Sequence, residues 1–146
     1  MRFLVLNGPN LNLLGRREPG VYPPVSLAQL EKRLADLAAE LGVEVSCQQH
    51  QCEGRLITAL HEAADWADGV IFNPAAYTHY SIALRDAVAA MDIPVLEVHL
   101  TNTAAREPFR HISVISPVAS GTIVGLGVMG YELALRALKD LARERG

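Results

Sequence analysis

Residues 3–22 read FLVLNGPNLNLLGRREPGVY, in which a short apolar strand runs directly into a long polar loop. In an open α/β sheet, ligands bind in the crevice beyond the carboxyl ends of the strands. A loop between a strand and a helix usually spans roughly two to six residues, and this one is about three times longer. It carries three Asn, two Arg, a Glu and a Tyr, groups that bind anions or handle protons. The segment is therefore a candidate site of chemistry.

The composition describes an apolar chain with no basic surface. Its 146 residues predict a single domain over residues 1–146. Half of them are hydrophobic and the mean hydropathy is +0.17, so we expect surplus apolar surface to be covered in a homo-oligomer. The net charge of −3, with no cluster of Lys and Arg, disfavours a nucleic-acid partner. No stretch approaches the roughly 20 apolar residues of a membrane span, and the start does not resemble a signal peptide. We therefore expect no membrane partner and a cytoplasmic protein.

Apolar periodicity predicts strands and helices in strict alternation. The expected strands are 2–6, 43–48, 69–72, 94–99 and 122–124, and the expected helices are 27–41, 55–67, 81–91 and 131–143. Ser26 and Gln29 form a capping box at the start of the first helix, and Gly42 ends it. This alternation implies a parallel sheet with helices on both faces.

Two further patterns are interpreted as structural. Residues 125–130, GLGVMG, fit the G-x-G-x-x-G pattern of dinucleotide-binding proteins, but the 16 residues that follow leave no room for the second strand of that motif. We interpret the glycines as a tight turn and a close helix contact. Cys47 and Cys52 bracket His50 in a spacing that matches no zinc site, so we predict no metal centre.

Reactive side chains follow three of the predicted strands. The first strand leads to Asn10, Arg17 and Tyr22, the third to Asn73 and His79, and the fourth carries Glu97, His99 and Thr101 with Arg106 and Arg110 just beyond. Glu97 and His99 are two residues apart, so their side chains share a face of the strand. A carboxylate in that position orients an imidazole and stabilises its charged form, which suits a general acid.

Each of these residues also has a purely structural interpretation. Tyr22 alone would be a loop anchor, and His99 a hydrogen-bonded residue at a strand end. Asp86 would be a solvated helix charge beside Arg85, and Arg106 and Arg110 a surface pair with Glu107. The convergence of three strand ends on one crevice favours a catalytic site.

The same residues resemble a known family. Residues 7–19 with Tyr22, Asn73-Pro74, Thr78-His79, Glu97-Val98-His99, Arg106-Glu107, Phe109-Arg110 and Gly130-Tyr131 resemble, in order and spacing, the type II 3-dehydroquinate dehydratases. The resemblance implies a flavodoxin-like α/β fold with a five-stranded parallel sheet of order 2-1-3-4-5. It also implies no cofactor, a homododecamer built as a tetramer of trimers, and the conversion of 3-dehydroquinate to 3-dehydroshikimate in the shikimate pathway.

The resemblance further implies a role for each site residue. As the base, Tyr22 takes a proton to leave an enolate, and His99 protonates the departing hydroxyl while Glu97 holds its ring. Arg17 stabilises the transition state, and Asn10 holds a water or donor on the enolate. The substrate-binding residues are Asn73, His79 and Arg110 on the ring and its hydroxyls, Leu100 (backbone) and Thr101 on the carboxylate, and Asp86 reaching into a neighbouring subunit's site. One departure adds a methyl group near the substrate, since the family's Asn-Pro-Gly-Ala reads Asn73-Pro74-Ala75-Ala76.

Ionising Tyr22 to a phenolate requires energy that depends on how well its loop excludes water. A free phenol has a pKa of about 10, so ionising it near neutrality needs about 4 kcal/mol. One arginine at about 4 Å supplies ~1 kcal/mol in bulk water but ~4 kcal/mol at an effective dielectric of about 20. Arg17 therefore suffices only when the loop closes and excludes water. An imine mechanism is excluded by placement, because Lys32 and Lys139 lie in predicted helices away from this edge.

Two other classes of protein use a similar scaffold, namely a flavodoxin-like nucleotide or cofactor binder and a non-catalytic assembly protein. A lyase predicts that Tyr22→Phe and Arg17→Gln each lose most activity while assembly survives, because both changes remove chemistry rather than packing. A rate assay with 3-dehydroquinate and size-exclusion chromatography test this directly. An assembly protein predicts that neither substitution changes any measurable property.

Overall fold

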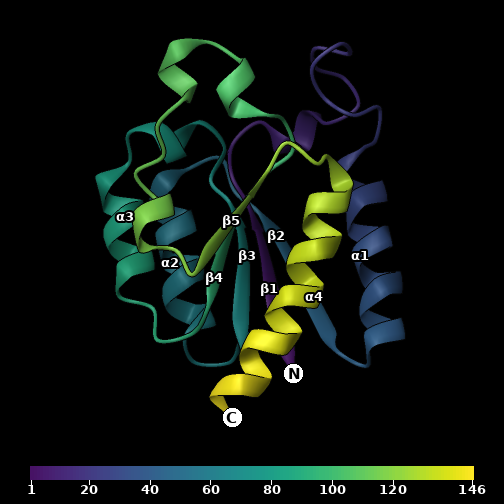
Figure 1. The fold of residues 1–146 in the computed structure, drawn as a ribbon, viewed down its shortest axis with the longest axis vertical. Coiled ribbons are helices and arrows are strands. Elements are labelled where there is room, and N and C mark those ends of the chain that lie inside the picture. The colour runs from purple at the N-terminus through teal and green to yellow at the C-terminus, as the bar shows by residue number, and fades with distance from the viewer.

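Five parallel strands form one sheet in the order β2-β1-β3-β4-β5 in the computed structural model, which describes residues 1–146 (Figure 1). The strands are β1 (Arg2–Asn7), β2 (Glu44–Gln49), β3 (Gly69–Asn73), β4 (Val95–His99) and β5 (Gly121–Val124), and the helices are α1 (Leu27–Leu41), α2 (Glu53–Ala63), α3 (Ile82–Ala89) and α4 (Val128–Arg145). The predicted α/β class and strand order are confirmed.

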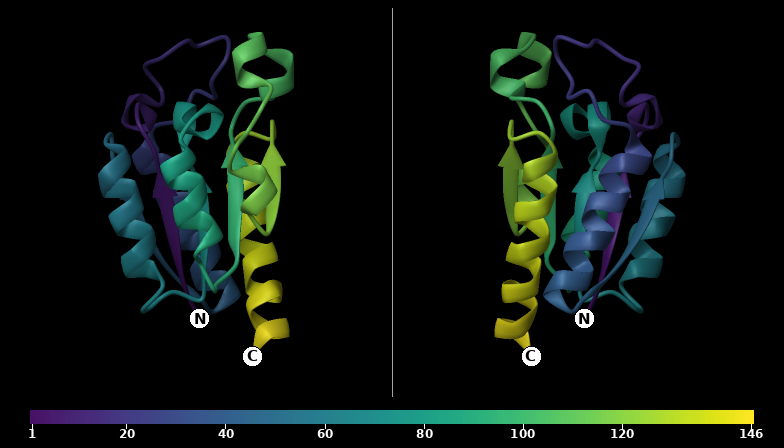
Figure 2. Two further views of the ribbon diagram at one scale, coloured as in Figure 1. Left: turned by 90° about the vertical axis from the view of Figure 1, so that its left-hand side faces the viewer. Right: turned by 90° about the vertical axis from the view of Figure 1, so that its right-hand side faces the viewer.

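Helices cover the two faces of the sheet in pairs. In Figure 2, α2 and α3 face the viewer in the left panel, and α1 and α4 in the right panel. Successive β1 residues alternate between the two cores: Phe3 and Val5 pack with the α1 and α4 side, and Leu4 and Leu6 with the α2 and α3 side. Because both faces are covered, β3 and, from Phe3 onward, β1 are apolar without interruption until they reach Asn73 and Asn7, whereas β4 carries the buried Glu97 at its middle.

The predicted element bounds hold best where capping is strong. Helix α1 has the expected bounds, and the capping box of Ser26 and Gln29 is formed. Helix α2 begins two residues earlier than predicted and ends at Ala63, after which tight turn bonds lead the chain into β3. Helix α4 begins at Val128, three residues earlier than predicted, because Gly130 lies inside the helix instead of in the turn before it.

The connection from β4 to β5 contains no α-helix, so the strict alternation predicted for the chain fails here. It is built from three 3-10 turns, η3 (Thr103–Ala105), η4 (Pro108–Arg110) and η5 (Ser116–Val118). Proline stands near the start of η4 and of η5. A proline fits the first turn of a helix, and here each one lies at or beside the start of a single 3-10 turn. The first two turns lie above the carboxyl ends of the strands (green in Figure 1).

The glycines of residues 125–130 serve the turn and packing roles predicted for them. Gly125 has a φ of +87°, and a side chain there would meet Asn102 at 3.1 Å. A side chain at Gly130 would meet Ile123 of β5 at 3.3 Å. No set of three His, Cys, Asp or Glu side chains is arranged to hold a metal ion. None of the helices combines the length and the apolar character that a membrane crossing requires.

The two thiols differ in environment, which predicts different reactivity. Burial, and secondarily the nearby charge of Glu31, raises the pKa of Cys47 to about 12, whereas Cys52 is exposed. Because the thiolate is the reactive form, we expect an aromatic disulfide reagent at pH 8 to modify Cys52 quickly and Cys47 only after unfolding. In Cys52→Ser the fast phase should vanish. Two equally fast thiols in the native protein would contradict the burial of Cys47.

Candidate active site

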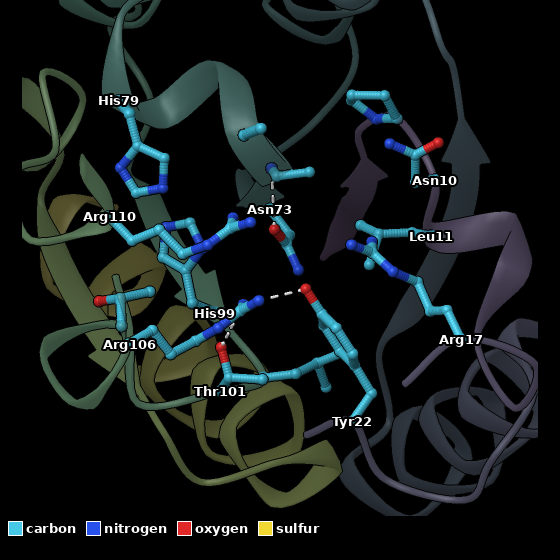
Figure 3. A pocket seen from close by; sticks show the side chains of 15 residues that line it. Asn10, Leu11, Arg17, Tyr22, Asn73, His79, His99, Thr101, Arg106 and Arg110 are labelled. Carbon is cyan, nitrogen blue, oxygen red and sulfur yellow. Dashed lines mark hydrogen bonds between the residues drawn. The ribbon is translucent and has the colours of Figure 1, made fainter. Parts of the chain in front are cut away.

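A cavity of about 160 Å³ opens where β1, β3 and β4 end. The loops that follow β1 and β3 meet closely, since the N–H of Gly8 donates to the carbonyl of Asn73 at 2.8 Å. A side chain at Gly8 would lie 2.6 Å from the Pro74 carbonyl oxygen, so only glycine permits this approach. The polar residues around the cavity are Asn10, Arg17, Tyr22, Asn73, His79, His99, Thr101, Thr103, Arg106 and Arg110 (Figure 3).

The Tyr22 side chain enters the cavity between two guanidinium groups. Arg106 Nη1 donates to the Tyr22 hydroxyl at 3.0 Å (Figure 3). The guanidinium carbon of Arg17 lies 4.4 Å from the centroid of the same ring. Arg17 therefore contacts Tyr22 as the sequence predicted, but through the ring, and the cation at the oxygen is Arg106.

Arg106 is a cavity residue to which the sequence assigned no catalytic or binding role. Arg106 does approach Glu107, with its Nε 3.7 Å from that carboxylate, but its side chain is only 12% exposed, so it is not the surface residue of the structural alternative. It also donates to Thr101 Oγ1 at 3.2 Å and lies 3.8 Å from the carboxylate of Glu18 in the loop after β1. Its position in the sequence could have indicated this role, because it directly follows η3 (Thr103–Ala105) and lies between the predicted site residues Thr101 and Arg110.

Glu97 and His99 form a buried pair on one face of β4. Nε2 of His99 lies 2.5 Å from Oε2 of Glu97, whose side chain has no solvent exposure. Burial alone would raise the pKa of Glu97, but hydrogen bonds and charge from His99, with hydroxyl donors from Ser116 and Thr78, outweigh it and hold that pKa below its ordinary value. Nδ1 of His99 has no hydrogen-bond partner in the protein, and the ring lines the cavity.

Two more predicted site residues, His79 and Asn73, are fixed by hydrogen bonds within the protein. Nδ1 of His79 lies 2.8 Å from the carbonyl of Ile112, which can only accept, so Nε2 is left available. Asn73 donates through Nδ2 to the hydroxyl of Tyr131 at 2.8 Å and accepts from the N–H of Ala75. Tyr131 in turn donates to Asn7 Oδ1 at 2.7 Å, which makes a buried chain beneath the cavity.

The remaining predicted residues divide into those at the cavity and one away from it. Asn10, Leu100, Thr101 and Arg110 all line it. The N–H groups of Leu100 and Thr101 donate no backbone hydrogen bond within the chain. Asp86 is different: its side chain is 64% exposed on α3 and pairs with Arg85 at 2.8 Å, outside this cavity.

Three non-glycine residues adopt left-handed backbone conformations, and all flank the site. Asn10 has a φ of 68°, Glu18 of 38° and Ala75 of 54°. Such conformations cost energy and cluster where function demands a particular geometry. Ala75 stands where the resembled family has glycine, so its methyl group adds strain beside the cavity.

Comparison with known proteins gives one consistent result. The sequence profile described as Dehydroquinase class II matches residues 1–139. A 3-dehydroquinate dehydratase from Anoxybacillus flavithermus is 58% identical over 146 residues, covering 100% of this chain and 99% of the relative. A relative of the same name from Pelotomaculum thermopropionicum is 61% identical and covers 97% and 99%. The crystal structure of a type II dehydroquinase from Butyrivibrio crossotus has a TM-score of 0.93 at 45% identity, covering 95% of this chain and 97% of that one.

The lowered pKa of Glu97 predicts a pH-dependent contribution to stability. A carboxyl group whose pKa falls on folding stabilises the protein above its ordinary pKa, here 4.5, and that contribution is lost as the pH falls through the lowered value. We expect the unfolding free energy from urea titrations to decline more steeply between about pH 5 and pH 3 in the wild type than in Glu97→Gln. Glu62→Gln, at an exposed site on α2, should keep the wild-type slope. Equal slopes for wild type and Glu97→Gln would contradict the prediction.

Proposed function

The chain belongs to the class II dehydroquinase family, and we propose that Tyr22, His99 and two arginines of its cavity carry out the family's reaction. That reaction removes water from 3-dehydroquinate to give 3-dehydroshikimate in the shikimate pathway. The observation that carries the residue assignment is the hydrogen bond from Arg106 to the Tyr22 hydroxyl, in a cavity that also holds His99.

Tyr22 is the base in this proposal. Its phenolate takes the proton α to the ketone, and the electron pair of the C–H bond forms an enolate. Arg106 stabilises the negative oxygen directly at 3.0 Å, and Arg17 lies against the ring face. Both guanidinium groups therefore lie where they can interact with negative charge on Tyr22.

His99 is the acid. The imidazolium gives its Nδ1 proton to the β-hydroxyl as the C–O bond breaks and the enolate electrons form the new double bond, so that one water leaves. The contact between Nε2 and Glu97 supports this assignment, because it fixes the ring and leaves Nδ1 directed at the cavity. Protonation from one side and proton removal from the other give the expected trans elimination.

The other cavity residues are proposed to hold the substrate. The free N–H groups of Leu100 and Thr101, with the Thr101 hydroxyl, would bind the carboxylate. The ring hydroxyls would contact Asn73, His79 and Arg110. Asn10 would place a water or its own amide on the developing enolate.

A homododecamer is proposed for the assembled enzyme, in the cytoplasm. Asp86 is exposed and remote from the cavity of its own chain, which is what a residue serving a neighbour's site requires. Large apolar side chains are also exposed in two places. Tyr80 and Ile82 lie where η2 (Ala75–His79) leads into α3, and Phe109 and Ile112 lie in and just after η4. Burying these side chains between subunits would stabilise the assembly through the hydrophobic effect.

We expect Arg106→Gln to lower kcat on the order of 100-fold, because the phenolate loses a charged hydrogen-bond donor. The assay adds 3-dehydroquinate and follows the ultraviolet absorption of the conjugated enone product. Arg55→Gln, at an exposed site on α2, is the matched control and should keep the wild-type rate. An Arg106→Gln enzyme with full activity would show that Arg17 alone serves the base, and absence of product with the folded wild type would reject the site assignment altogether.

A further inference from the structure

The Glu97 carboxylate has partners that the elimination itself does not use. Ser116 in η5 donates to Oε1 at 2.6 Å, Ser113 Oγ lies 2.9 Å from both carboxylate oxygens, and Thr78 in η2 donates to Oε2. We propose that Ser113 and Ser116 are positioning residues of the reaction: their hydroxyls keep the carboxylate anionic and fixed, so that the proton of the Glu97–His99 pair stays on the imidazole. The inference rests on the proposed role of His99 as the acid.

The hydrogen of Ser113 is directed by the backbone around it. The N–H groups of Ile115 and Ser116 lie 3.1 and 3.0 Å from Ser113 Oγ and donate to it. A hydroxyl has two lone pairs and one hydrogen, so these two bonds leave the hydrogen for an acceptor on the other side. Two acceptors lie there, the carboxylate of Glu97 at 2.9 Å and Oγ1 of Thr78 at 2.8 Å, and the charged carboxylate binds the hydrogen more strongly. The loop before β5 therefore supplies a donor that is oriented before any substrate binds.

Neutral donors suit this position better than a second cation. A buried carboxylate without donors would take the proton from its imidazole partner, and a neutral imidazole is a much weaker acid than an imidazolium. An arginine would also stabilise the carboxylate, but its charge would compete with the imidazolium. Hydroxyl groups stabilise the anion and leave its charge uncancelled. The nearby Arg110 is kept from this role because it pairs with Glu107 at 3.1 Å.

No other titratable group replaces the serines. A second cavity, of about 280 Å³, lies behind the pair, and the charged or titratable groups that face Glu97 around it are His79, His99, Arg110 and His111. His79 is bonded to the carbonyl of Ile112, and the ring of His111 to the carbonyl of Arg106. Only His99 among these groups touches the carboxylate.

The test compares Ser116→Ala with Ser120→Ala, a change on the same segment whose hydroxyl bonds the N–H of Val95 instead. Loss of a hydrogen bond to a charged group predicts a kcat about tenfold lower in Ser116→Ala, with KM within about twofold of the wild type. The acid limb of the kcat profile should move to higher pH by about half a unit or more, because the carboxylate takes up a proton more easily. Ser120→Ala should change neither quantity.

A second readout does not depend on activity. The carboxyl carbon of Glu97, followed by NMR during an acid titration, should have a higher midpoint in Ser116→Ala than in the wild type, and Ser113→Ala should act in the same direction. An unshifted midpoint, or a kcat lowered equally at every pH, would overturn the proposal. His99→Ala separates a failure of the acid assignment from a failure of the serine proposal. If His99→Ala stays active, His99 is not the acid. If His99→Ala is inactive and the serine variants are unaffected, only the role of the serines is rejected.

Discussion

A fully buried carboxylate beneath an imidazole is the constraint on which this site depends. Glu97 has no contact with solvent, and its negative charge is held by hydrogen bonds from His99, η2 and the loop that leads into β5. Satisfying one buried charge therefore ties two separate segments, η2 and the connection before β5, to β4. By fixing Glu97, these bonds also fix the His99 ring that contacts it and lines the cavity. The proposed acid is therefore positioned by the same contacts that satisfy the buried charge.

The alternation of side chains along the strands separates two polar systems. Glu97 and His99 lie on one face of β4, whereas Leu96 and Val98 pack into the core beneath α1 and α4. On that other face, Tyr131 joins Asn7 and Asn73 across the ends of β1 and β3, and burial raises the pKa of Tyr131. The cavity sits above both systems, so the amide of Asn73, proposed to bind substrate, and the Glu97–His99 pair, proposed to donate the proton, are supported from opposite sides of the sheet.

Sequence periodicity and capping sufficed for the strands and for α1, since both signals are local. The strand order came with the resemblance to a family. The strict alternation expected for the chain does not hold at the β4–β5 connection, where none of the expected helices lies and the structure has only short turns. The shared face of Glu97 and His99 could be predicted, because pleating fixes the direction of side chains along a strand. Arg106 and Ser116 were missed because they lie in irregular turns, where only tertiary contacts determine which way a side chain points.

The proposed base lies on a loop, and the proposed acid lies on a strand that is paired on both sides. Tyr22 lies on a long loop that owes its shape to a few turn bonds, whereas His99 ends a central strand paired on both sides. Loop residues can change without disturbing the sheet, but a change near His99 strains the ladder and the buried carboxylate together. Engineering of this scaffold should therefore find catalytic rate adjustable through the loop residues other than Gly8, Asn10, Arg17 and Tyr22, whereas changes at the strand end should cost stability as well as activity.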